Sequence, residues 1–519
     1  MDRDTMLDRV ADQDEPWDLV VVGGGATGVG IALDAASRGY RILLLEAKDF
    51  GQGTSSRSTK LVHGGVRYLR QGNVPLVMEA LRERGILRRN APHLVKDLGF
   101  VVPNYDWWEA PFYGIGLKVY DALAGKYGFG NSRLLSRDET LERLPTLERE
   151  GLRGGVIYHD GQFDDARLLL HLVWTAWEQG AVLLNHAPVT ALEKDTAGFI
   201  SGVRARDELG GQELEIPARA VINATGVFAD GLRRLDEPGV PGLIAPSQGV
   251  HVVLPRRFHP GEDAIMVPQT DDGRVLFAVP WHDRVLVGTT DTPVREPDPE
   301  PVPLAEEVDY LLRHAARYLE EDPEREDVLS AFAGLRPLVR GEDGADTASL
   351  SRDHTLQVSP SGLVTITGGK WTTYRKMAED AVDHAAAIAG LALHPSPTRE
   401  LQVHGYHLQS ERYGVLAAYG SDALEIEALA RSRPSWGEPF HPELDLTPAE
   451  VIWAVREEMA ARLEDVLSRR SRSLVLNARA SLQVAAPVAA LMARELGKDE
   501  AWRDGEVRRF SELAGGYVV

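Results

Sequence analysis

The feature that most constrains this chain is a glycine-rich turn between a short apolar run and a pattern of small residues. Residues 19–22 are apolar and too few for a core helix, so they predict a buried strand. The glycines of residues 23–28 follow with the spacing G-x-G-x-x-G, and a second apolar run, residues 42–45, ends in Glu46. This order predicts a dinucleotide-binding unit, in which backbone N–H groups approach a pyrophosphate and the acid binds a ribose hydroxyl. A glycine turn in an ordinary α/β domain would not explain the acid.

Composition narrows the classes of function. The 519 residues predict two or three domains with an ample core. Acidic residues (78) outnumber basic ones (57) and give a net charge of −21, so we predict no nucleic-acid partner. Because the chain has no cysteine, it cannot form a disulfide, a cysteinyl-flavin link or an iron–sulfur cluster. We also predict no metal site.

The N-terminal region and the hydropathy pattern bear on location. Residues 1–16 are rich in aspartate and lack the basic and apolar parts of a secretion signal, so we expect a polar leader. No apolar run reaches the length of a transmembrane helix. Residues 107–124 are rich in aromatic side chains and hold few charges. They predict either a helix in a domain interface or a segment that contacts a membrane surface.

The rest of the chain alternates strand and helix patterns. Short strands predominate between residues 246 and 367, which indicates an antiparallel sheet. Beyond the proline-rich residues 394–398, residues 400–519 are expected to form a small helical domain, in which Thr447 and Glu450 fit a capping box. Other helices are predicted over residues 75–90, 164–179, 304–319 and 374–389.

Seven motifs give the chain a family resemblance. It resembles the FAD-dependent glycerol-3-phosphate dehydrogenases of the aerobic, membrane-associated type over nearly its whole length. The first and third motifs occur in many flavoproteins, whereas the second and the last three together are much more specific. The motifs are residues 21–28, 54–69, 223–226, 287–291, 334–338, 351–353 and 368–376.

The resemblance implies an α/β fold with three parts. These are a Rossmann-like FAD-binding domain, an interleaved antiparallel-sheet substrate domain and a C-terminal α-helical domain, residues 400–519. The FAD-binding domain is expected to be discontinuous and the substrate domain to interrupt it. The expected boundaries are 17–100, 150–245 and 355–392 for the FAD-binding domain, and 101–149 and 246–354 for the substrate domain.

The implied reaction is the oxidation of sn-glycerol 3-phosphate to dihydroxyacetone phosphate by hydride transfer from C2 to N5 of FAD. Electrons would pass to a membrane quinone. We therefore expect a peripheral enzyme on the cytoplasmic face of the inner or plasma membrane, or a cytoplasmic one, and the sequence allows a homodimer. Three alternatives stay open: an α-glycerophosphate oxidase that uses O₂, an FAD oxidase of a 2-hydroxy or amino acid, and a flavoprotein without catalysis.

The implied substrate is a phosphate dianion, so its pocket needs fixed cations, and the planar fork of arginine suits phosphate. The resemblance assigns substrate binding to Arg67, Tyr68, Arg336, Arg352 and Lys370. Arg336 lies in an apolar stretch, where a buried charge needs a partner. Arg336 and Lys370 are assigned to catalysis as well, since a cation at Lys370 near the flavin N1–C2 carbonyl would stabilise reduced flavin. Alternatively, Arg67 pairs with a surface acid and Lys370 holds a loop.

His251 is the candidate general base. It matches a histidine in the family's Gly-Ser-His motif, and the pKa range of histidine suits a base. Val250 replaces the serine here, so the hydrogen bond of that serine is missing. The alternative is a core histidine with its hydrogen bonds satisfied.

FAD is expected rather than NAD because Glu46 is joined by a polar loop, residues 54–60, and by a late glycine turn, residues 368–373. His63 is expected to contact the flavin without a covalent link. The residues assigned to the cofactor are Gly23, Gly25, Ala26, Thr27, Gly28, Glu46, Thr54, Ser55, Ser56, Ser58, Lys60, His63, Gly64, Val189, Ala224, Thr225, Gly226, Gly369, Lys370, Thr372 and Thr373.

Overall fold

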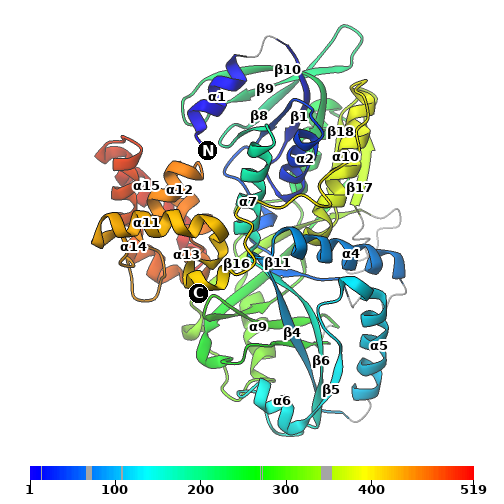
Figure 1. Ribbon diagram of the computed structural model, residues 1–519, viewed down its shortest axis with the longest axis vertical. Coiled ribbons are helices and arrows are strands. Elements are labelled where there is room, and N and C mark those ends of the chain that lie inside the picture. Colours follow the sequence, from blue (N-terminus) through cyan, green and yellow to red (C-terminus); the bar gives the residue numbers. More distant parts are fainter. Residues whose placement is uncertain (13–14, 66–72, 107–108, 269, 272, 341–353) are drawn as a thin grey trace.

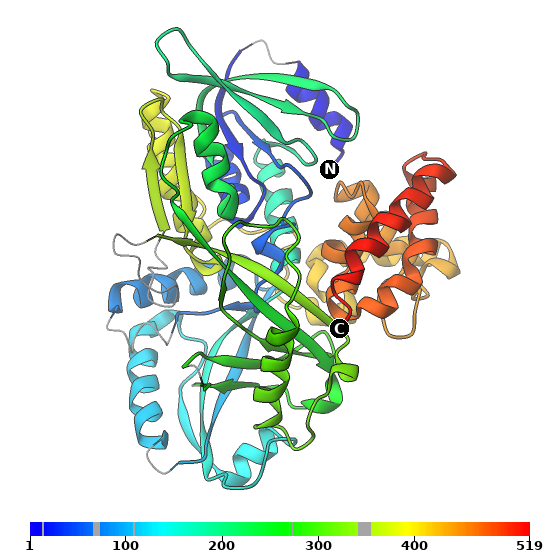
Figure 2. The same cartoon turned by 180° about the vertical axis from the view of Figure 1, so that it is seen from behind.

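The computed structural model shows two sheets along the long axis of the molecule, with a helical domain beside them (Figure 1). Figure 2 shows from behind that the helical domain packs where the two sheets meet. The structure describes residues 1–12, 15–65, 73–106, 109–268, 270–271, 273–340 and 354–519.

The first sheet is built on the predicted dinucleotide unit. Strand β1 (Trp17–Val22) pairs in parallel with β2 (Ile42–Leu45) on one side and with β10 (Glu213–Asn223) on the other. The strand order is β17-β18-β10-β1-β2-β7, and β8 and β9 continue from β10. The other strands are β7 (Val182–Leu184), β8 (Val189–Lys194), β9 (Ile200–Arg206), β17 (His354–Val358) and β18 (Val364–Gly368).

Helices cover the parallel part of this sheet and bury its apolar strands. Helix α2 (Ala26–Ser37) packs against α7 (Asp165–Glu178) and α10 (Tyr374–Ile388). The small residues of α2 are buried almost throughout, because a parallel sheet is covered on its faces by helices. Helix α8 (Ala229–Asp236) follows β10. The strand–turn–helix–strand prediction is confirmed.

The second sheet has the order β15-β11-β14-β13-β12-β4-β6-β3, with β16 paired to β11 and β5 to β6. Most pairs in it are antiparallel, as expected, but β12 runs parallel to β4. Its strands are β3 (Leu61–Val62), β4 (Val95–Asn104), β5 (Arg133–Ser136), β6 (Gly154–Phe163), β11 (Ile244–Pro255), β12 (Ala264–Val267), β13 (Leu276–Trp281), β14 (Arg284–Gly288), β15 (Thr292–Pro293) and β16 (Ser330–Val339).

Two of the expected domain boundaries differ from this pairing. Strands β3, β4 and β6 lie largely within segments assigned to the FAD-binding domain, yet they pair inside the second sheet. Their partners lie far along the chain, so no local pattern places them. The helices attached to this sheet are α4 (Val74–Asn90), α5 (Glu109–Ala124), α6 (Arg137–Arg143) and α9 (Ala305–Ala316).

The N-terminal residues correct another expectation. In place of a polar leader, residues 3–11 form helix α1 (Arg3–Ala11), whose N-cap Asp2 accepts a hydrogen bond from the Thr5 amide. Its side chains Met6 and Val10 are buried against the first sheet's core. Arg3 Nη2 lies 2.6 Å from Asp207, so α1 is tied to the sheet by charge as well.

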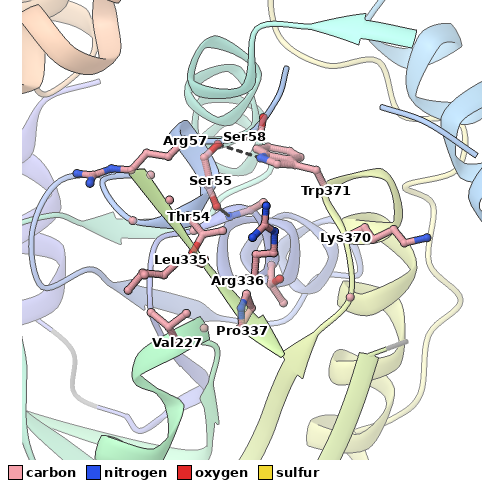
Figure 3. A pocket seen from close by; sticks show the side chains of 18 of the residues that line it. Thr54, Ser55, Arg57, Ser58, Val227, Leu335, Arg336, Pro337, Lys370 and Trp371 are labelled. Carbon is pink, nitrogen blue, oxygen red and sulfur yellow. Dashed lines mark hydrogen bonds between the residues drawn. The ribbon is translucent and has the colours of Figure 1, made fainter. Parts of the chain in front are cut away.

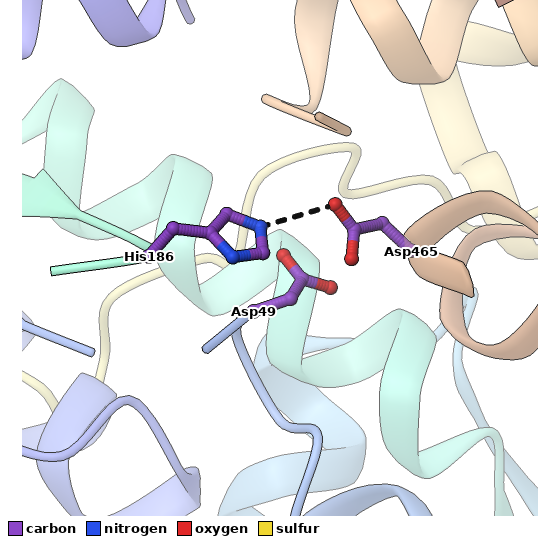
Figure 4. A group of neighbouring side chains, drawn as sticks. All are labelled: Asp49, His186 and Asp465. Atoms are coloured by element: carbon purple, nitrogen blue, oxygen red, sulfur yellow. Dashed lines mark hydrogen bonds and ion pairs between the residues drawn. The ribbon is translucent and has the colours of Figure 1, made fainter. Parts of the chain in front are cut away.

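The C-terminal domain is helical, as predicted, and the capping box of Thr447 and Glu450 is present. A buried ion-pair junction joins it to the first sheet (Figure 4). The side chains of Asp49, His186 and Asp465 lie close together there. Arg469 lies 2.5 Å from Asp49, so its positive charge balances a carboxylate of this group. The helices are α11 (Ala423–Ser432), α12 (Pro448–Glu457), a π-helix (Asp465–Arg470), α13 (Ser473–Leu476), α14 (Ala478–Glu495) and α15 (Glu500–Gly515).

The aromatic segment 107–124 is helical from Glu109 onward, in α5, and Trp107 and Trp108 lie outside the described residues. The side chains of Leu117, Tyr120 and Ala124 are buried, so one face of α5 packs on the protein. Within the described part of the chain, every helix is too short or too polar to span a bilayer.

Candidate functional site

A cavity of about 370 Å³ lies where the glycine turn of the first sheet meets β11 and β16 of the second (Figure 3). It brings together segments from most of the chain. Those segments include the β1–α2 turn, residues 51–63, residues 224–228, β11, β16 and residues 366–372.

The glycine turn can be this tight only because its glycines have no side chain. Gly23 has φ +113°, and a Cβ there would lie 2.6 Å from the Ala224 carbonyl oxygen. A Cβ at Gly28 would lie 1.8 Å from the Gly23 carbonyl oxygen. The turn is therefore as tight as a dinucleotide fingerprint requires, and the N-terminus of α2 opens on the cavity at Gly25 and Ala26.

Glu46 lies at the end of β2 and lines the same cavity. Its two carboxylate oxygens accept hydrogen bonds from the amides of Gly24, at 2.6 Å, and Lys48, at 2.8 Å. Burial raises the pKa of this carboxyl, although the two backbone amides oppose the change. The acid thus braces the glycine turn, and its contact with a ribose stays a prediction.

The polar loop ties the two sheets together around the cavity. Thr54 Oγ1 donates to the Leu335 carbonyl oxygen at 2.6 Å, and Trp371 Nε1 donates to the Ser55 carbonyl oxygen at 2.9 Å (Figure 3). Ser55 Oγ also accepts from the Ala26 amide at 2.9 Å. The loop therefore holds both the start of α2 and the late glycine turn.

Lys60 occupies a different place from the one predicted. It is fully buried behind the cavity wall, with Nζ 2.7 Å from Asp165 Oδ2 and 2.8 Å from the Ser56 carbonyl oxygen. Burial lowers the pKa of Lys60 to about 7. Neither Lys60 nor Ser56 lines the cavity, and the same holds for Gly28, Gly64, Val189 and Thr373.

Arg336 on β16 lines the cavity, as predicted. Its guanidinium donates to the carbonyl oxygens of Gln248, at 3.3 Å, and Thr290, at 3.0 Å, and to Thr289 Oγ1 at 3.1 Å. Asp291 lies 3.2 Å from Nη1. These contacts fix the orientation of a half-buried positive charge in the cavity wall.

The other predicted substrate ligands are described only in part. Lys370 lines the cavity, but its ammonium points away from Arg336 (Figure 3). Arg67, Tyr68 and Arg352 lie outside the described residues. The expected cluster of five substrate ligands therefore stays a prediction.

His251 on β11 lines the cavity and is almost fully buried, with 3% of its surface exposed. Its Nε2 lies 2.9 Å from Thr59 Oγ1, and its ring stacks on Phe332 with 5.0 Å between centroids. Burial holds the pKa of His251 well below its usual value, and the charges of Lys60 and Arg336 lower it further. Thr59 thus provides a hydrogen bond to the His251 ring.

Sequence reasoning overlooked Arg57 and Thr59, although both lie in the predicted loop and line the cavity. Arg57 is buried and points away from Arg336, toward Glu300, at 2.5 Å from its carboxylate (Figure 3). Tyr517, near the C-terminus, donates to the other oxygen of Glu300 at 2.8 Å. The only signal for these roles was membership of the loop. Further lining residues are Gly51, Gln52, Leu61, Phe277, Pro337, Ile366, Trp371 and Met377.

Comparisons with known proteins agree with this site. Residues 18–375 match the family model described as FAD dependent oxidoreductase, and residues 364–503 match the C-terminal domain of alpha-glycerophosphate oxidase. The mitochondrial glycerol-3-phosphate dehydrogenase of Macaca fascicularis is 41% identical over 93% of this chain and 71% of its own length. The human enzyme is 40% identical over 96% of this chain and 74% of its own length.

Solved structures show the same relation. The glycerol-3-phosphate dehydrogenase of Bacillus halodurans, determined with FAD, is 31% identical, covers 100% of this chain and 98% of that one, and superposes with a TM-score of 0.81. The L-alpha-glycerophosphate oxidase of Mycoplasma pneumoniae, also with FAD, is 18% identical over 74% of this chain and 97% of that one, with a TM-score of 0.57. The second likeness shows a shared fold.

Proposed function

The chain belongs to the family of FAD-dependent glycerol-3-phosphate dehydrogenases, and we propose that it oxidises sn-glycerol 3-phosphate to dihydroxyacetone phosphate. The observation that carries this is the cavity itself. The glycine turn and Glu46 form one of its walls, and the oriented cation of Arg336 lies in another. A site that holds a dinucleotide beside a fixed guanidinium suits an anionic substrate of a flavoenzyme.

The residues of the cavity fit FAD. Gly23, Gly25 and Ala26 would hold the pyrophosphate against the start of α2, and Glu46 would bind the ribose. Bound FAD supplies the hydride acceptor for the substrate's C2–H bond. The predicted contact of His63 is supported by its place in the cavity wall.

The protein's own side chains orient the substrate and handle its proton. Arg336 attracts the phosphate dianion and is pre-oriented by its backbone contacts, so little reorganisation is needed on binding. His251 is neutral because of its lowered pKa, and a neutral imidazole can accept the proton of the C2 hydroxyl. Phe277 and Trp371 add apolar surface that excludes water.

Anaerobic stopped-flow spectroscopy tests this function. The purified holoenzyme is mixed with sn-glycerol 3-phosphate, and the flavin absorbance near its visible maximum is followed. We expect rapid bleaching with this substrate and no bleaching at the same concentration of glycine or lactate. An enzyme bleached by glycine or lactate but not by glycerol 3-phosphate would instead be an FAD oxidase of amino or hydroxy acids.

The electron acceptor is proposed to be a membrane quinone, with the protein attached to the membrane surface. The support is the family, whose curated members at about 40% identity are named as mitochondrial glycerol-3-phosphate dehydrogenases. Reduced enzyme is mixed separately with air-saturated buffer and with an anaerobic quinone analogue. Faster reoxidation by the quinone supports the proposal, and faster reoxidation by O₂ would make the protein an oxidase.

The candidate membrane contact is the outer face of α5 and the neighbouring β5. Val119 on α5 is 46% exposed and Leu134 on β5 is 60% exposed. Leu134 lies beside α5 at Gly114, so the two elements carry neighbouring exposed apolar side chains. Replacing both by glutamate should reduce sedimentation with anionic liposomes, while Phe199→Glu, at an exposed apolar residue of the first sheet's domain, should not. Equal binding by both variants would place the contact elsewhere. The homodimer stays a prediction, which sedimentation velocity would test by giving the mass of the protein in solution.

A further inference from the structure

Thr59 and His251 line the cavity next to each other, and a hydrogen bond joins their side chains. Thr59 is half-buried and lines the cavity, whereas His251 is 3% exposed. The ring nitrogen that contacts Thr59 is Nε2, which lies 2.9 Å from Thr59 Oγ1. The other nitrogen, Nδ1, is sealed from solvent and has no hydrogen-bond partner among the described residues. Thr59 Oγ1 is therefore the polar atom in contact with the only ring nitrogen that has a hydrogen-bond partner among the described residues.

The surroundings of His251 prevent the ring from turning Nδ1 into the cavity. Strand β11 is paired on both sides, with His251 opposite Gly288 on β14 and opposite Phe332 on β16. The ring stacks on Phe332 at an interplanar angle of 13°. On the other side the packing is close, since a Cβ at Gly288 would lie 2.1 Å from His251 Cδ2. The contact between Nε2 and Thr59 is therefore a fixed feature of the site.

Burial and nearby positive charges keep the imidazole of His251 unprotonated before the reaction. Lys60, which follows Thr59, and Arg336 both lower the pKa of His251, after burial itself. The imidazole is therefore neutral before the reaction and can accept a proton. The hydroxyl of Thr59 is neutral and can donate and accept at once, so it can link the substrate to the ring without adding charge to the cavity.

We propose that Thr59 is a catalytic residue whose hydroxyl relays the substrate proton to His251 Nε2. This rests on the proposed function. As the C2–H electron pair leaves with its hydrogen as hydride to the bound cofactor, the C2 oxygen forms the carbonyl and gives its proton to Thr59 Oγ1. The Thr59 proton passes at the same time to Nε2. The threonine ends as a neutral hydroxyl, the histidine as imidazolium, and the substrate as a ketone, so charge and atoms balance.

The relay requires Nε2 to be the accepting nitrogen before reaction, with the ring proton on Nδ1. A threonine that only anchors the ring could accept from Nε2–H equally well. The two roles differ in the tautomer and in the number of protons that move in the rate-limiting step. Both differences can be measured.

The experiment compares Thr59→Val, which removes the hydroxyl at nearly constant volume, with Thr59→Ser, which keeps it. Thr190→Val on the exposed face of β8 is the control. By anaerobic stopped flow, Thr59→Val should slow flavin reduction by about 10²-fold or more with bound FAD unchanged, and Thr59→Ser should keep most of the rate. A Thr59→Val enzyme that reduces its flavin at the wild-type rate would overturn the relay.

Two further readouts separate the relay from anchoring. In mixtures of H₂O and D₂O, the reduction rate of the wild type should curve with deuterium content, as for two protons in flight, and a straight line would exclude the relay. Histidine ¹⁵N NMR, with His251→Gln for assignment, should show Nε2 as the unprotonated nitrogen, and a protonated Nε2 would refute it. The NMR result needs no turnover, so it stands even if glycerol 3-phosphate proves not to be the substrate.

Discussion

The two sides of the cavity are built in different ways. On the nucleotide side, one continuous segment of backbone, residues 22–28, is braced by the carboxylate of Glu46. On the substrate side, His251, Arg336 and Thr59 come from three separate segments and act through their side chains. A site made of backbone tolerates almost no added volume, and a site made of side chains depends on charge and hydrogen bonding.

The difference also shows in how each side is held in place. The glycine turn directly connects β1 to α2, so most of its backbone path is set by neighbouring residues. Arg336 is positioned by the carbonyl oxygens of Gln248 on β11 and of Thr290, which precede it by more than forty residues. Substitutions on the nucleotide side should therefore remove the cofactor, and those on the substrate side should leave FAD bound while slowing the reaction.

The largest effect is expected for Gly28→Ala. The new Cβ would lie 1.8 Å from the Gly23 carbonyl oxygen, so the turn must open, and overpacking of this kind costs about 1–3 kcal/mol or more. The purified variant should retain no FAD, as judged by the ratio of visible to ultraviolet absorbance. Gly231→Ala on α8, where a Cβ meets nothing within 4 Å, is the matched control. A Gly28→Ala protein that retains a full complement of bound FAD would show that the turn does not bind the cofactor.

Arg336→Ala should have the next largest effect, on the other side. Loss of the oriented guanidinium should lower kcat/KM for glycerol 3-phosphate by about 10²- to 10³-fold with FAD retained. Arg336→Lys should recover little, because an ammonium cannot make the same forked contacts. The exposed Arg325→Ala, which loses a surface pair with Asp309 and a hydrogen bond to the Ala305 carbonyl oxygen, should behave like the wild type. Loss of FAD from Arg336→Ala would contradict the division between the two sides.

The same contrast explains what could be predicted from the sequence. The glycine spacing and Glu46 were recognisable because the residues that form a backbone-built site lie close together in the sequence. Arg336 and His251 were found through the family's motifs, and both do line the cavity. Neither contact that fixes His251, with Thr59 and with Phe332, has a local signal, because β11 and β16 are brought together only by the fold.

Errors arose where a partner distant in sequence decides the role of a charge. Lys60 resembled a phosphate ligand within a polar loop, but Asp165 on α7 pairs with it out of reach of the cavity. The aspartate-rich N-terminus lacked an apolar run, yet two side chains of α1, Met6 and Val10, are enough to dock it. In both cases the segment is as polar as its composition indicates. Its position in the fold is decided by contacts with residues distant in the sequence.

Glu46→Gln should have a smaller effect, on the nucleotide side. The carboxylate accepts from two backbone amides, whereas the side-chain amide of glutamine has one accepting oxygen, so one N–H would lose its partner. We expect the dissociation constant of FAD to rise about tenfold, equal to about 1.4 kcal/mol. Titration of apoprotein with FAD by fluorescence measures it, with the exposed Glu425→Gln as control. An unchanged constant would mean that the brace is dispensable.

The smallest expected effects are those of pH on FAD affinity and on the rate of flavin reduction. Burial shifts the pKa values of the two groups concerned in opposite directions. Burial raises the pKa of Glu46 and, with Lys60 and Arg336, lowers that of His251. Below its raised pKa, Glu46 gains a proton that competes with its amide contacts. FAD affinity should therefore begin to fall at a higher pH than for an ordinary carboxyl. His251 must be neutral to accept a proton, and a lowered pKa keeps it neutral at pH 6.5.

The rate of flavin reduction at saturating substrate should accordingly change by less than about twofold between pH 8 and pH 6.5, whereas a base of ordinary pKa near 6.5 would lose half its activity there. Lys60→Met sharpens the test. Lys60 carries its ammonium below its pKa of about 7. Its removal should therefore raise the pKa of His251 near pH 6.5 and move the acid limb toward that pH, while Arg472, 3.1 Å from Asp165, still neutralises that carboxylate. An acid limb at pH 6.5 in the wild type would mean that the base lies in a more exposed part of the cavity than His251.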